Sequence, residues 1–323
     1  TMSAPPPYRP PPWRPGLSVL LDRHRETLRG LRVGLVSHAA AVDESGRPSA
    51  DRLHAQPDVR LTALFGPEHG FAGLAAAGES TDDARHPHWK IPIHSLYGAR
   101  RRPDPAHFRE LDLLLFDLQD LGARPYTYVS TLRACLEVAA ETQTPVIVAD
   151  RPIPLPQTID GPPLDPACAS FVGAIPAPML YGMTPGETAR WLAERLDLKL
   201  HLRVIPMESY RRVPFTALPP WTWIPPSPRI RSPFAAQCFT ATVFSEGLPA
   251  IDNGTGLDEV FQVVGSGLAR PAAIQEALAA IRLPGLHLEP CIVTPKGGPW
   301  AGQSIGGARI GIDHPAQFQP VRL

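Results

Sequence analysis

A glutamate and a histidine stand side by side in the segment LFGPEHGFAG, where an apolar run ends in a turn rich in glycine. A carboxyl group held at the end of a strand can donate or accept a proton, which is the work of a general acid/base. Glycines at such a turn allow tight backbone conformations and leave room for a ligand to approach. Glu68 is therefore a candidate catalytic residue, with a helix cap or a solvated charge as the alternative.

Glycoside hydrolysis needs an acid that protonates the departing oxygen, and usually a second group that activates water or stabilises the positive centre. The chain offers four carboxylates as the second group: Glu79, Asp117, Asp120 and Glu246. Taken alone, any of these residues could equally be a helix cap or a solvated charge. The distance between two carboxylates decides between retention and inversion, and the sequence does not supply it.

Aromatic and basic side chains in the predicted loops could bind a sugar. Four aromatic residues lie outside helical stripes and could either stack on a sugar ring or pack between domains: Tyr126, Tyr128, Trp221 and Trp223. Arg124 and Arg151 are candidates for binding a substrate carboxylate, because a guanidinium binds a carboxylate through two parallel hydrogen bonds. Internal ion pairs with Asp117 or Asp150 are the alternative for both arginines.

Other chemistries have weaker support in the sequence. The histidines at 69, 86, 88 and 94 could be metal ligands, but they lack a fixed spacing such as H-E-x-x-H, so we predict no metal. No G-x-S-x-G accompanies Ser130 or Ser227, which argues against a serine nucleophile. No strand is followed by G-x-G-x-x-G, so we predict no nicotinamide or flavin cofactor.

The elements that must position these residues alternate between strands and helices. We predict strands at 32–40, 58–65, 111–116 and 145–150, and helices at 18–29, 49–56 and 130–142 with Ser130 as the N-cap. The run at 111–116 is continuously apolar, as expected for a central strand of a parallel sheet. This alternation predicts an α/β domain with a Rossmann-like open parallel sheet.

In an open parallel sheet, ligands bind beyond the carboxyl ends of the strands. This rule places four segments on one rim: residues 37–38, the Glu68 turn, residues 117–128 and residues 150–151. The convergence of these segments favours a site there.

The second half of the chain predicts a smaller α+β domain that closes the pocket. A helix at 184–196 is followed by short strand-like pieces at 200–207 and 239–244, a proline-rich aromatic loop at 219–230 and a helix near 271–281. We place the boundaries at 1–16 for a proline-rich N-terminal tail, 17–200 for the Rossmann-like domain and 201–323 for the smaller one.

Composition limits the function classes. The 323 residues carry a formal net charge of zero, which gives no field that would attract nucleic acid or anionic lipid. No apolar stretch is long enough for a membrane span, and the segment after Met2 lacks the apolar core of a signal peptide, so we expect a cytoplasmic protein if Met2 is the native start. Four scattered cysteines indicate reduced, mostly buried thiols. The oligomeric state stays open.

Several motifs occur in one order along the chain: ALFGPEHGFAG, SLYG, LLFDLQDLGARPYTYVSTL, VADRP, DGPPLDP, SFVGAIPAPMLYGMTPGETA and WIPPSP. Together they resemble the NamZ-type exo-β-N-acetylmuramidases, a bacterial glycoside hydrolase family formerly known only as a domain of unknown function. The resemblance covers residues 17 to 320.

The resemblance implies two domains with a pocket between them, and the release of N-acetylmuramic acid from the non-reducing ends of peptidoglycan fragments. The family's presumed catalytic glutamate falls on Glu68. The lactyl carboxylate of the substrate would give Arg124 or Arg151 a task. The full set predicted to bind the saccharide is His69, Arg124, Tyr126, Tyr128, Arg151, Tyr181, Ser227, Glu246 and Thr255, and the catalytic set is Glu68, Asp120 and Glu79.

The chain departs from the family pattern at three single positions. Ile153, Tyr181 and Arg229 stand where the family commonly has asparagine, histidine and asparagine, and the segment at 244–256 lacks the family's usual arginine. The predicted function is therefore an exo-acting hydrolase for N-acetylmuramic acid or a related amino sugar. The alternative is a catalytically silent protein that binds muramyl saccharides through altered loops.

Overall fold

A seven-stranded sheet forms the larger domain of the structure, a computed structural model that describes residues 13–323. The predicted tail lies outside the described residues as far as residue 12. The strand order is β3-β4-β2-β1-β5-β6-β9, and every pair is parallel except β3 with β4. The strands are β1 (Arg32–Val36), β2 (Arg60–Gly66), β3 (Ala84–Arg85), β4 (Pro92–Ser95), β5 (Leu113–Phe116), β6 (Val146–Ala149) and β9 (Leu202–Ile205). The Rossmann-like open sheet is confirmed.

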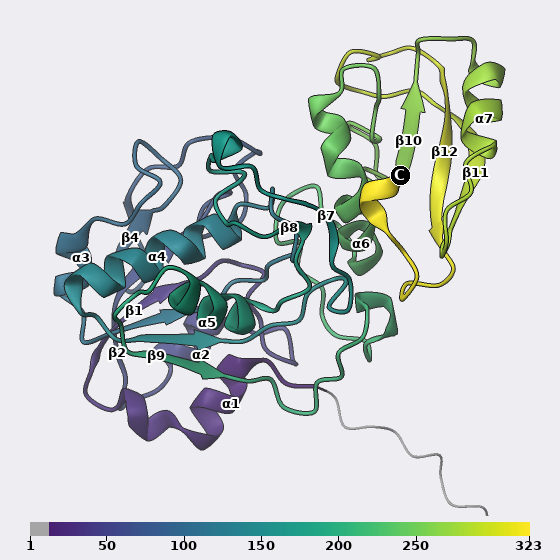
Figure 1. Ribbon diagram of the computed structural model, residues 1–323. Coiled ribbons are helices and arrows are strands. Elements are labelled where there is room, and N and C mark those ends of the chain that lie inside the picture. Colours follow the sequence, from purple (N-terminus) through teal and green to yellow (C-terminus); the bar gives the residue numbers. More distant parts are fainter. Residues whose placement is uncertain (1–12) are drawn as a thin grey trace, which may run out of the picture.

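Helices cover both faces of this sheet (Figure 1). They are α1 (Gly16–Arg23), α2 (Ser49–His54), α3 (Pro105–Arg109), α4 (Tyr128–Thr142) and α5 (Pro185–Arg195). In β5, Leu113 and Leu115 pack in one apolar cluster with α1 and α2, whereas Leu114 and Phe116 pack in another with α3, α4 and α5. Because successive strand residues point to opposite faces, a strand buried on both faces must be apolar throughout.

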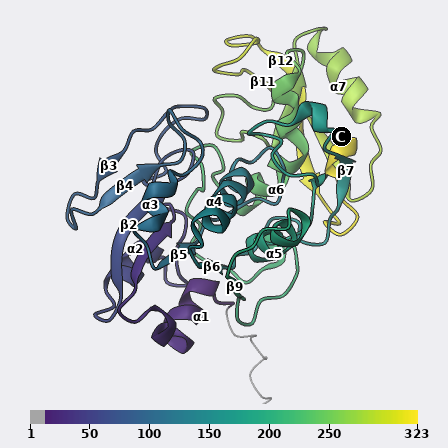
Figure 2. The ribbon, with the colours of Figure 1, turned by 60° about the vertical axis from the view of Figure 1, so that its left-hand side comes forward.

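The smaller domain contains the three-stranded antiparallel sheet β10-β12-β11, and α7 packs against it (Figure 2). Its elements are α6 (Pro233–Thr242), β10 (Val263–Ser266), α7 (Pro271–Ala279), β11 (Leu286–Val293) and β12 (Ile305–Ile312). A separate two-stranded ribbon, β7 (Asp160–Pro163) with β8 (Pro178–Leu180), precedes α5. Short 3-10 helices are η1 (Arg25–Leu28), η2 (Pro166–Cys168), η3 (Phe215–Ala217), η4 (Val243–Gly247) and η5 (Pro320–Arg322).

The sequence prediction assigned two strand-like pieces to the smaller domain, and the structure differs for both. The piece at 200–207 forms β9, which pairs with β6 at the edge of the large sheet, so that sheet extends past residue 200. The piece at 239–244 forms the end of α6 and the start of η4. Ser232 caps α6 by accepting from the Ala235 N–H, and residues 235–242 are all buried. Burial of the whole segment outweighs the strand propensity of its threonines.

The predicted cap of α4 was also wrong. The helix begins at Tyr128, and Thr127 is its N-cap residue. Ser130 lies inside the first turn, and its hydroxyl donates to the Phe171 carbonyl at 2.6 Å. The cap position therefore belongs to the residue that contacts Glu68, as described below.

The four cysteines are all unpaired, and three of them are buried. In the described part of the chain, no helix has both the length and the apolar character that a bilayer crossing requires.

Candidate active site

The turn that follows β2 holds Glu68 in a constrained backbone. His69 and Gly70 have left-handed φ angles of 71° and 75°. A Cβ atom at Gly66 would lie 2.6 Å from the Phe71 nitrogen, so the turn closes tightly only with glycine there. The His69 ring contacts the Ala75 carbonyl through Nδ1 at 2.8 Å, and because a carbonyl only accepts, Nδ1 carries the proton. These contacts fix the direction in which Glu68 points.

Both carboxylate oxygens of Glu68 accept hydrogen bonds from uncharged donors. The Gly78 N–H donates to Oε1 at 2.7 Å, and the Thr127 hydroxyl donates to Oε2 at 2.5 Å. Thr127 stands at the N-cap of α4 but makes no side-chain bond to that helix, so its hydroxyl serves Glu68 instead. Glu68 is thus held at the N-terminal end of α4.

A cavity of about 440 Å³ opens beside Glu68, and both domains line it. The larger domain supplies the Glu68 turn, Tyr97 and residues 125–127, and the smaller one supplies residues from α6, η4 and the loop that precedes β10. Five residues predicted to act in the site do line this cavity: Glu68, His69, Tyr126, Ser227 and Glu246. Of the four segments assigned to the rim, the Glu68 turn and residues 117–128 reach the cavity wall, whereas residues 37–38 and 150–151 do not line it.

Asp120 and Tyr181 do not line this cavity but pair with each other in the interior. The Tyr181 hydroxyl donates to Asp120 Oδ2 at 3.0 Å, and the Leu121 N–H donates to Oδ1 at 2.8 Å. Burial raises the pKa of Asp120 to about 6 and raises that of Tyr181 well above its usual value. Asp120 is thus buried and does not belong to the lining of this cavity.

Tyr128 also lies behind the cavity wall, next to His38. The Gln119 N–H donates to His38 Nε2 at 3.0 Å, so the proton of the neutral ring sits on Nδ1, which faces the Tyr128 hydroxyl at 3.2 Å. Tyr128 in turn donates to the Pro226 carbonyl at 2.5 Å. Burial first, and then the charge of Arg151, lower the pKa of His38 to about 3. This series of hydrogen bonds connects the large sheet to the loop that carries Ser227.

Neither of the two predicted arginines faces the cavity. Arg151 forms a buried ion pair with Asp117 and also donates to the Val42 carbonyl at 3.0 Å and the Ser49 hydroxyl at 3.1 Å. Arg124 donates to the Ala177 carbonyl at 2.6 Å. The structure thus gives Arg151 the internal ion pair that was its alternative, and it gives Arg124 backbone partners.

Glu79 and Thr255 likewise make local contacts. Glu79 Oε2 accepts from the Ala76 N–H at 2.7 Å and closes its own turn. The Thr255 N–H donates to Asp252 Oδ1 at 3.1 Å, and its hydroxyl lies 3.3 Å from Asn253 Oδ1. Neither side chain is part of the cavity wall.

The predicted aromatic loop packs between segments. Trp221 lies edge-on to Trp13 at 5.7 Å and to Phe215 at 5.4 Å, and the Trp223 Nε1–H donates to the Ile230 carbonyl at 3.1 Å. The tryptophans therefore take the packing role that was one of their two alternatives.

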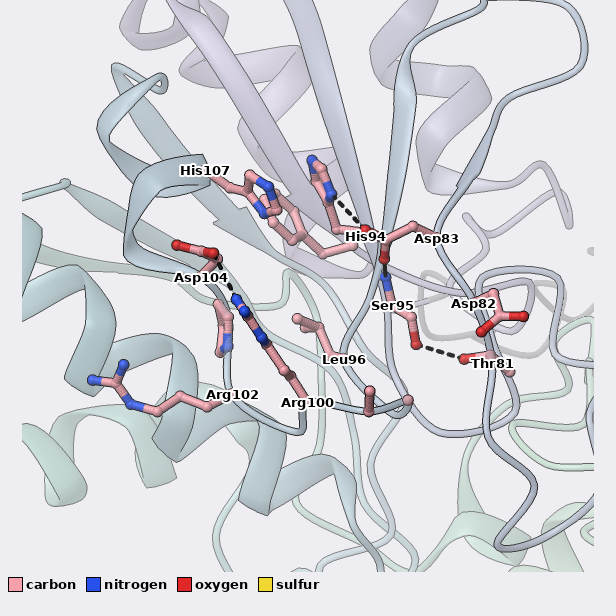
Figure 3. Close-up of a pocket in the computed structure, with 14 residues that line it drawn as sticks. Thr81, Asp82, Asp83, His94, Ser95, Leu96, Arg100, Arg102, Asp104 and His107 are labelled. Carbon is pink, nitrogen blue, oxygen red and sulfur yellow. Dashed lines mark hydrogen bonds and ion pairs between the residues drawn. The ribbon is translucent and has the colours of Figure 1, made fainter.

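A second cavity, of about 270 Å³, lies beside β4 and α3 (Figure 3). The His94 and His107 rings stack there at 3.6 Å, and Arg100 pairs with Asp104 at 2.7 Å. Asp83 accepts from the Ser95 N–H at 2.7 Å and approaches His94 at 3.5 Å. Arg100 and Asp83 thus have partners within this cavity, whereas Arg102 pairs with Glu141 outside it. Among residues 13–323, no group of three or more histidine, cysteine or carboxylate side chains is arranged to hold a metal ion.

Two family models together match nearly the whole described chain. The N-terminal domain of the exo-β-N-acetylmuramidase NamZ matches residues 33–233, and the C-terminal domain matches residues 237–323. The chain belongs to the NamZ family. Membership makes it a glycosidase, as the motifs predicted, and the junction of the two models falls at the start of α6.

Similar proteins are known from two bacteria. A Bacillus subtilis (strain 168) protein named peptidoglycan β-N-acetylmuramidase NamZ is 34% identical over 95% of this chain and 74% of its own length. Two DUF1343 family proteins from Bacteroides fragilis NCTC 9343 have similar crystal structures. The first has a TM-score of 0.89 and 30% identity, and covers 97% of this chain and 80% of its own. The second has a TM-score of 0.72 and 25% identity, with 93% and 76% covered.

The cavity beside Glu68 is also lined by residues that the sequence prediction did not assign to the site: Tyr97, Thr127, Arg229, Phe239 and Phe261. Tyr97 and Thr127 lie inside the quoted motifs SLYG and YTY, so position within a motif could have indicated them. Phe239 and Phe261 come from the smaller domain, and no local pattern marks them as facing Glu68.

Proposed function

We propose that this NamZ-family glycosidase is exo-acting and releases N-acetylmuramic acid, or a related amino sugar, from the non-reducing ends of peptidoglycan fragments. The B. subtilis relative, which carries the name peptidoglycan β-N-acetylmuramidase, supports the substrate class. The cavity between the domains has a suitable size and lining for a small saccharide, with few polar groups among apolar walls.

Glu68 is the general acid/base in this proposal. The observation that carries the assignment is that Glu68 lines the cavity while Gly78 and Thr127 hold both of its oxygens. As an acid it gives its proton to the departing glycosidic oxygen, and the resulting carboxylate then takes a proton from water. Because its partners are uncharged, neither protonation state breaks an ion pair.

Glu246 is the second carboxylate in the cavity wall, whereas Asp120 and Glu79 lie outside it. Its Oε1 accepts from Arg229 Nη1 at 2.8 Å, so a cationic side chain lies beside the carboxylate. A charged carboxylate can stabilise an oxocarbenium-like transition state. The acetamide of the substrate itself is the other group that could take this place.

Aromatic side chains complete the proposed saccharide site. Tyr97, Tyr126, Phe239 and Phe261 line the cavity and offer apolar surface to the faces of a sugar ring. His69 and Ser227 add polar contacts, since Nε2 of His69 is not used by the bond to Ala75. These residues fix the orientation that general acid catalysis needs.

The test is hydrolysis of a chromogenic N-acetylmuramide by the wild type and by Glu68→Gln. Loss of a general acid is expected to reduce kcat by about 10²- to 10⁴-fold, with little change in Tm because glutamine has the same shape. Glu79→Gln is the matched control and should keep most of the activity, since Glu79 closes only its own turn.

Equal rates for the wild type and Glu68→Gln would remove Glu68 from the mechanism. A loss in Glu79→Gln as large as that in Glu68→Gln would make Glu79 the second catalytic group. Saturable binding of muramyl saccharides with no turnover by the wild type would instead support the silent binding protein.

A further inference from the structure

Arg229 is the one arginine or lysine among the described residues that line the Glu68 cavity. It comes from the loop before α6, in the segment PSPRI that also supplies Ser227. The two other arginines considered for a substrate carboxylate are engaged in the interior, Arg151 with Asp117 and Arg124 with backbone carbonyls. An anionic ligand in this cavity therefore meets one permanent positive charge.

Three neighbours hold the Arg229 guanidinium at the cavity wall. Its carbon lies 4.7 Å from the centre of the Phe261 ring, which is a cation–π arrangement. Nη1 donates to Glu246 at 2.8 Å, and Nη2 lies 3.4 Å from Asn253 Oδ1. These two contacts use two of the five N–H donors of a guanidinium. The side chain is 35% exposed, so a ligand can reach the remaining donors.

The charges of the cavity also require a cation. Glu68 and Glu246 both line it, and an acidic sugar would bring a third carboxylate into the same partly closed space. Like charges at close range raise the cost of binding when water is excluded. Arg229 offsets Glu246 in the free protein and can offset the ligand as well.

We propose that Arg229 binds the acidic group of the substrate sugar and thereby sets the preference for an acidic over a neutral glycone. This inference rests on the proposed function, because the lactyl carboxylate is the charge that distinguishes muramic acid from glucosamine. Phe261 and Glu246 hold the guanidinium so that its free N–H groups meet that carboxylate. Arg229 is thus a specificity-determining residue, and Glu246 and Phe261 position it.

The experiment compares two substrates and two proteins. The substrates are a chromogenic N-acetylmuramide and the same compound with its lactyl carboxylate converted to the primary amide, which removes the charge and keeps nearly the same size. The proteins are the wild type and Arg229→Gln. We expect Arg229→Gln to lower kcat/KM for the acid by about 10- to 100-fold, mainly through KM, and to change the amide by less than about threefold. Arg229→Lys should restore part of the preference.

Arg101→Gln is the matched control, since Arg101 also stacks on aromatic rings, Tyr97 at 4.6 Å and Phe171 at 5.1 Å, but does not line the cavity. It should leave the acid-to-amide ratio unchanged. If Arg229→Gln leaves that ratio as in the wild type, or if the wild type cleaves acid and amide equally well, the inference is overturned while the proposed function stands.

Absence of turnover by the wild type on both substrates would instead contradict the proposed function. The inference is then tested by calorimetric binding of free N-acetylmuramic acid and its primary amide to the same proteins. The inference is supported if the wild type binds the acid more tightly than the amide and Arg229→Gln loses this difference. Equal binding of both compounds to the wild type overturns it.

Discussion

Two polar clusters lie at the carboxyl ends of strands in the same sheet, and their surroundings differ. Glu68 follows β2, remains 9% exposed and accepts from a backbone N–H and a threonine hydroxyl at the wall of a cavity. Asp117 follows β5, is 0% exposed and pairs with Arg151, which is itself 2% exposed. Both carboxylates accept hydrogen bonds. The partners of Glu68 are uncharged, whereas Asp117 pairs with a charged guanidinium.

This difference bears on proton transfer, which we propose for Glu68 and not for Asp117. Protonation of Asp117 would leave the Arg151 guanidinium buried without its counter-charge, which is strongly unfavourable. Protonation of Glu68 leaves no unpaired ion behind. The type of partner, more than the position on the rim, therefore distinguishes the proposed catalytic group from the structural one.

Removal of Arg151 is expected to have the largest effect on stability. Arg151→Met leaves Asp117 buried and unpaired, and should lower the free energy of unfolding by about 3 to 5 kcal/mol. The matched control is Arg229→Met, whose ion pair is partly exposed and should cost at most about 1 kcal/mol. Urea unfolding measures both. Equal stability of the two variants would contradict the division between a structural and a functional arginine.

The pH dependence of stability tests the buried surroundings of Arg151 through its neighbour His38. The pKa of His38 is about 3 in the folded protein, below its usual value of 6.5, so the unfolded chain takes up a proton first as the pH falls. Stability is therefore complete above pH 6.5 and is lost toward pH 3, by about 2 kcal/mol between pH 6.5 and 5. His38→Asn should flatten this slope in urea unfolding at several pH values.

Asp120→Asn is the control of opposite sign. The pKa of Asp120 is raised to about 6 in the folded protein, so the folded state takes up that proton first and gains stability as the pH falls from 6 toward 3.8. Removing the carboxyl group should therefore steepen the loss of stability in acid. If both variants keep the wild-type slope, His38 and Asp120 do not titrate as the structure indicates.

How far the sequence predicts these clusters depends on the range of the interactions. The apolar runs before Phe65 and Phe116 indicate buried strands, and strand ends in a parallel sheet must share a rim, so the place of Glu68 could be predicted. The sequence could not show which arginine lines the cavity and which is buried. The place of each arginine depends on a partner far away in the sequence, Asp117 for Arg151 and Glu246 for Arg229.

The same contrast between local and long-range interactions decided which helices and strands could be predicted. The capping box at Thr184 and Glu187 is local, and α5 was predicted within two residues at each end. The segment at 239–244 has local strand propensity, yet tertiary burial makes it the end of α6 and the start of η4. The N-cap residue of α4 is Thr127, whose hydroxyl donates to the distant Glu68 and not to the helix, so no local cap pattern reveals it.

Replacement of Thr127 has the smallest expected effect on free energy and tests the comparison most directly. Thr127→Val removes the hydroxyl that holds Glu68 Oε2 but keeps the shape of the side chain. Since the hydroxyl does not cap α4 and water in the cavity can replace it at Glu68, the free energy of unfolding should fall by only about 1 to 2 kcal/mol. The loss should appear in kcat, by about tenfold, because an unheld carboxyl group spends less time in the reactive orientation. Thr127→Ser keeps the donor and should retain most of the activity. If Thr127→Val instead destabilises the protein as strongly as Arg151→Met does, the Glu68 cluster is held for structure in the same way as the Asp117 cluster, and the distinction drawn from their partners fails.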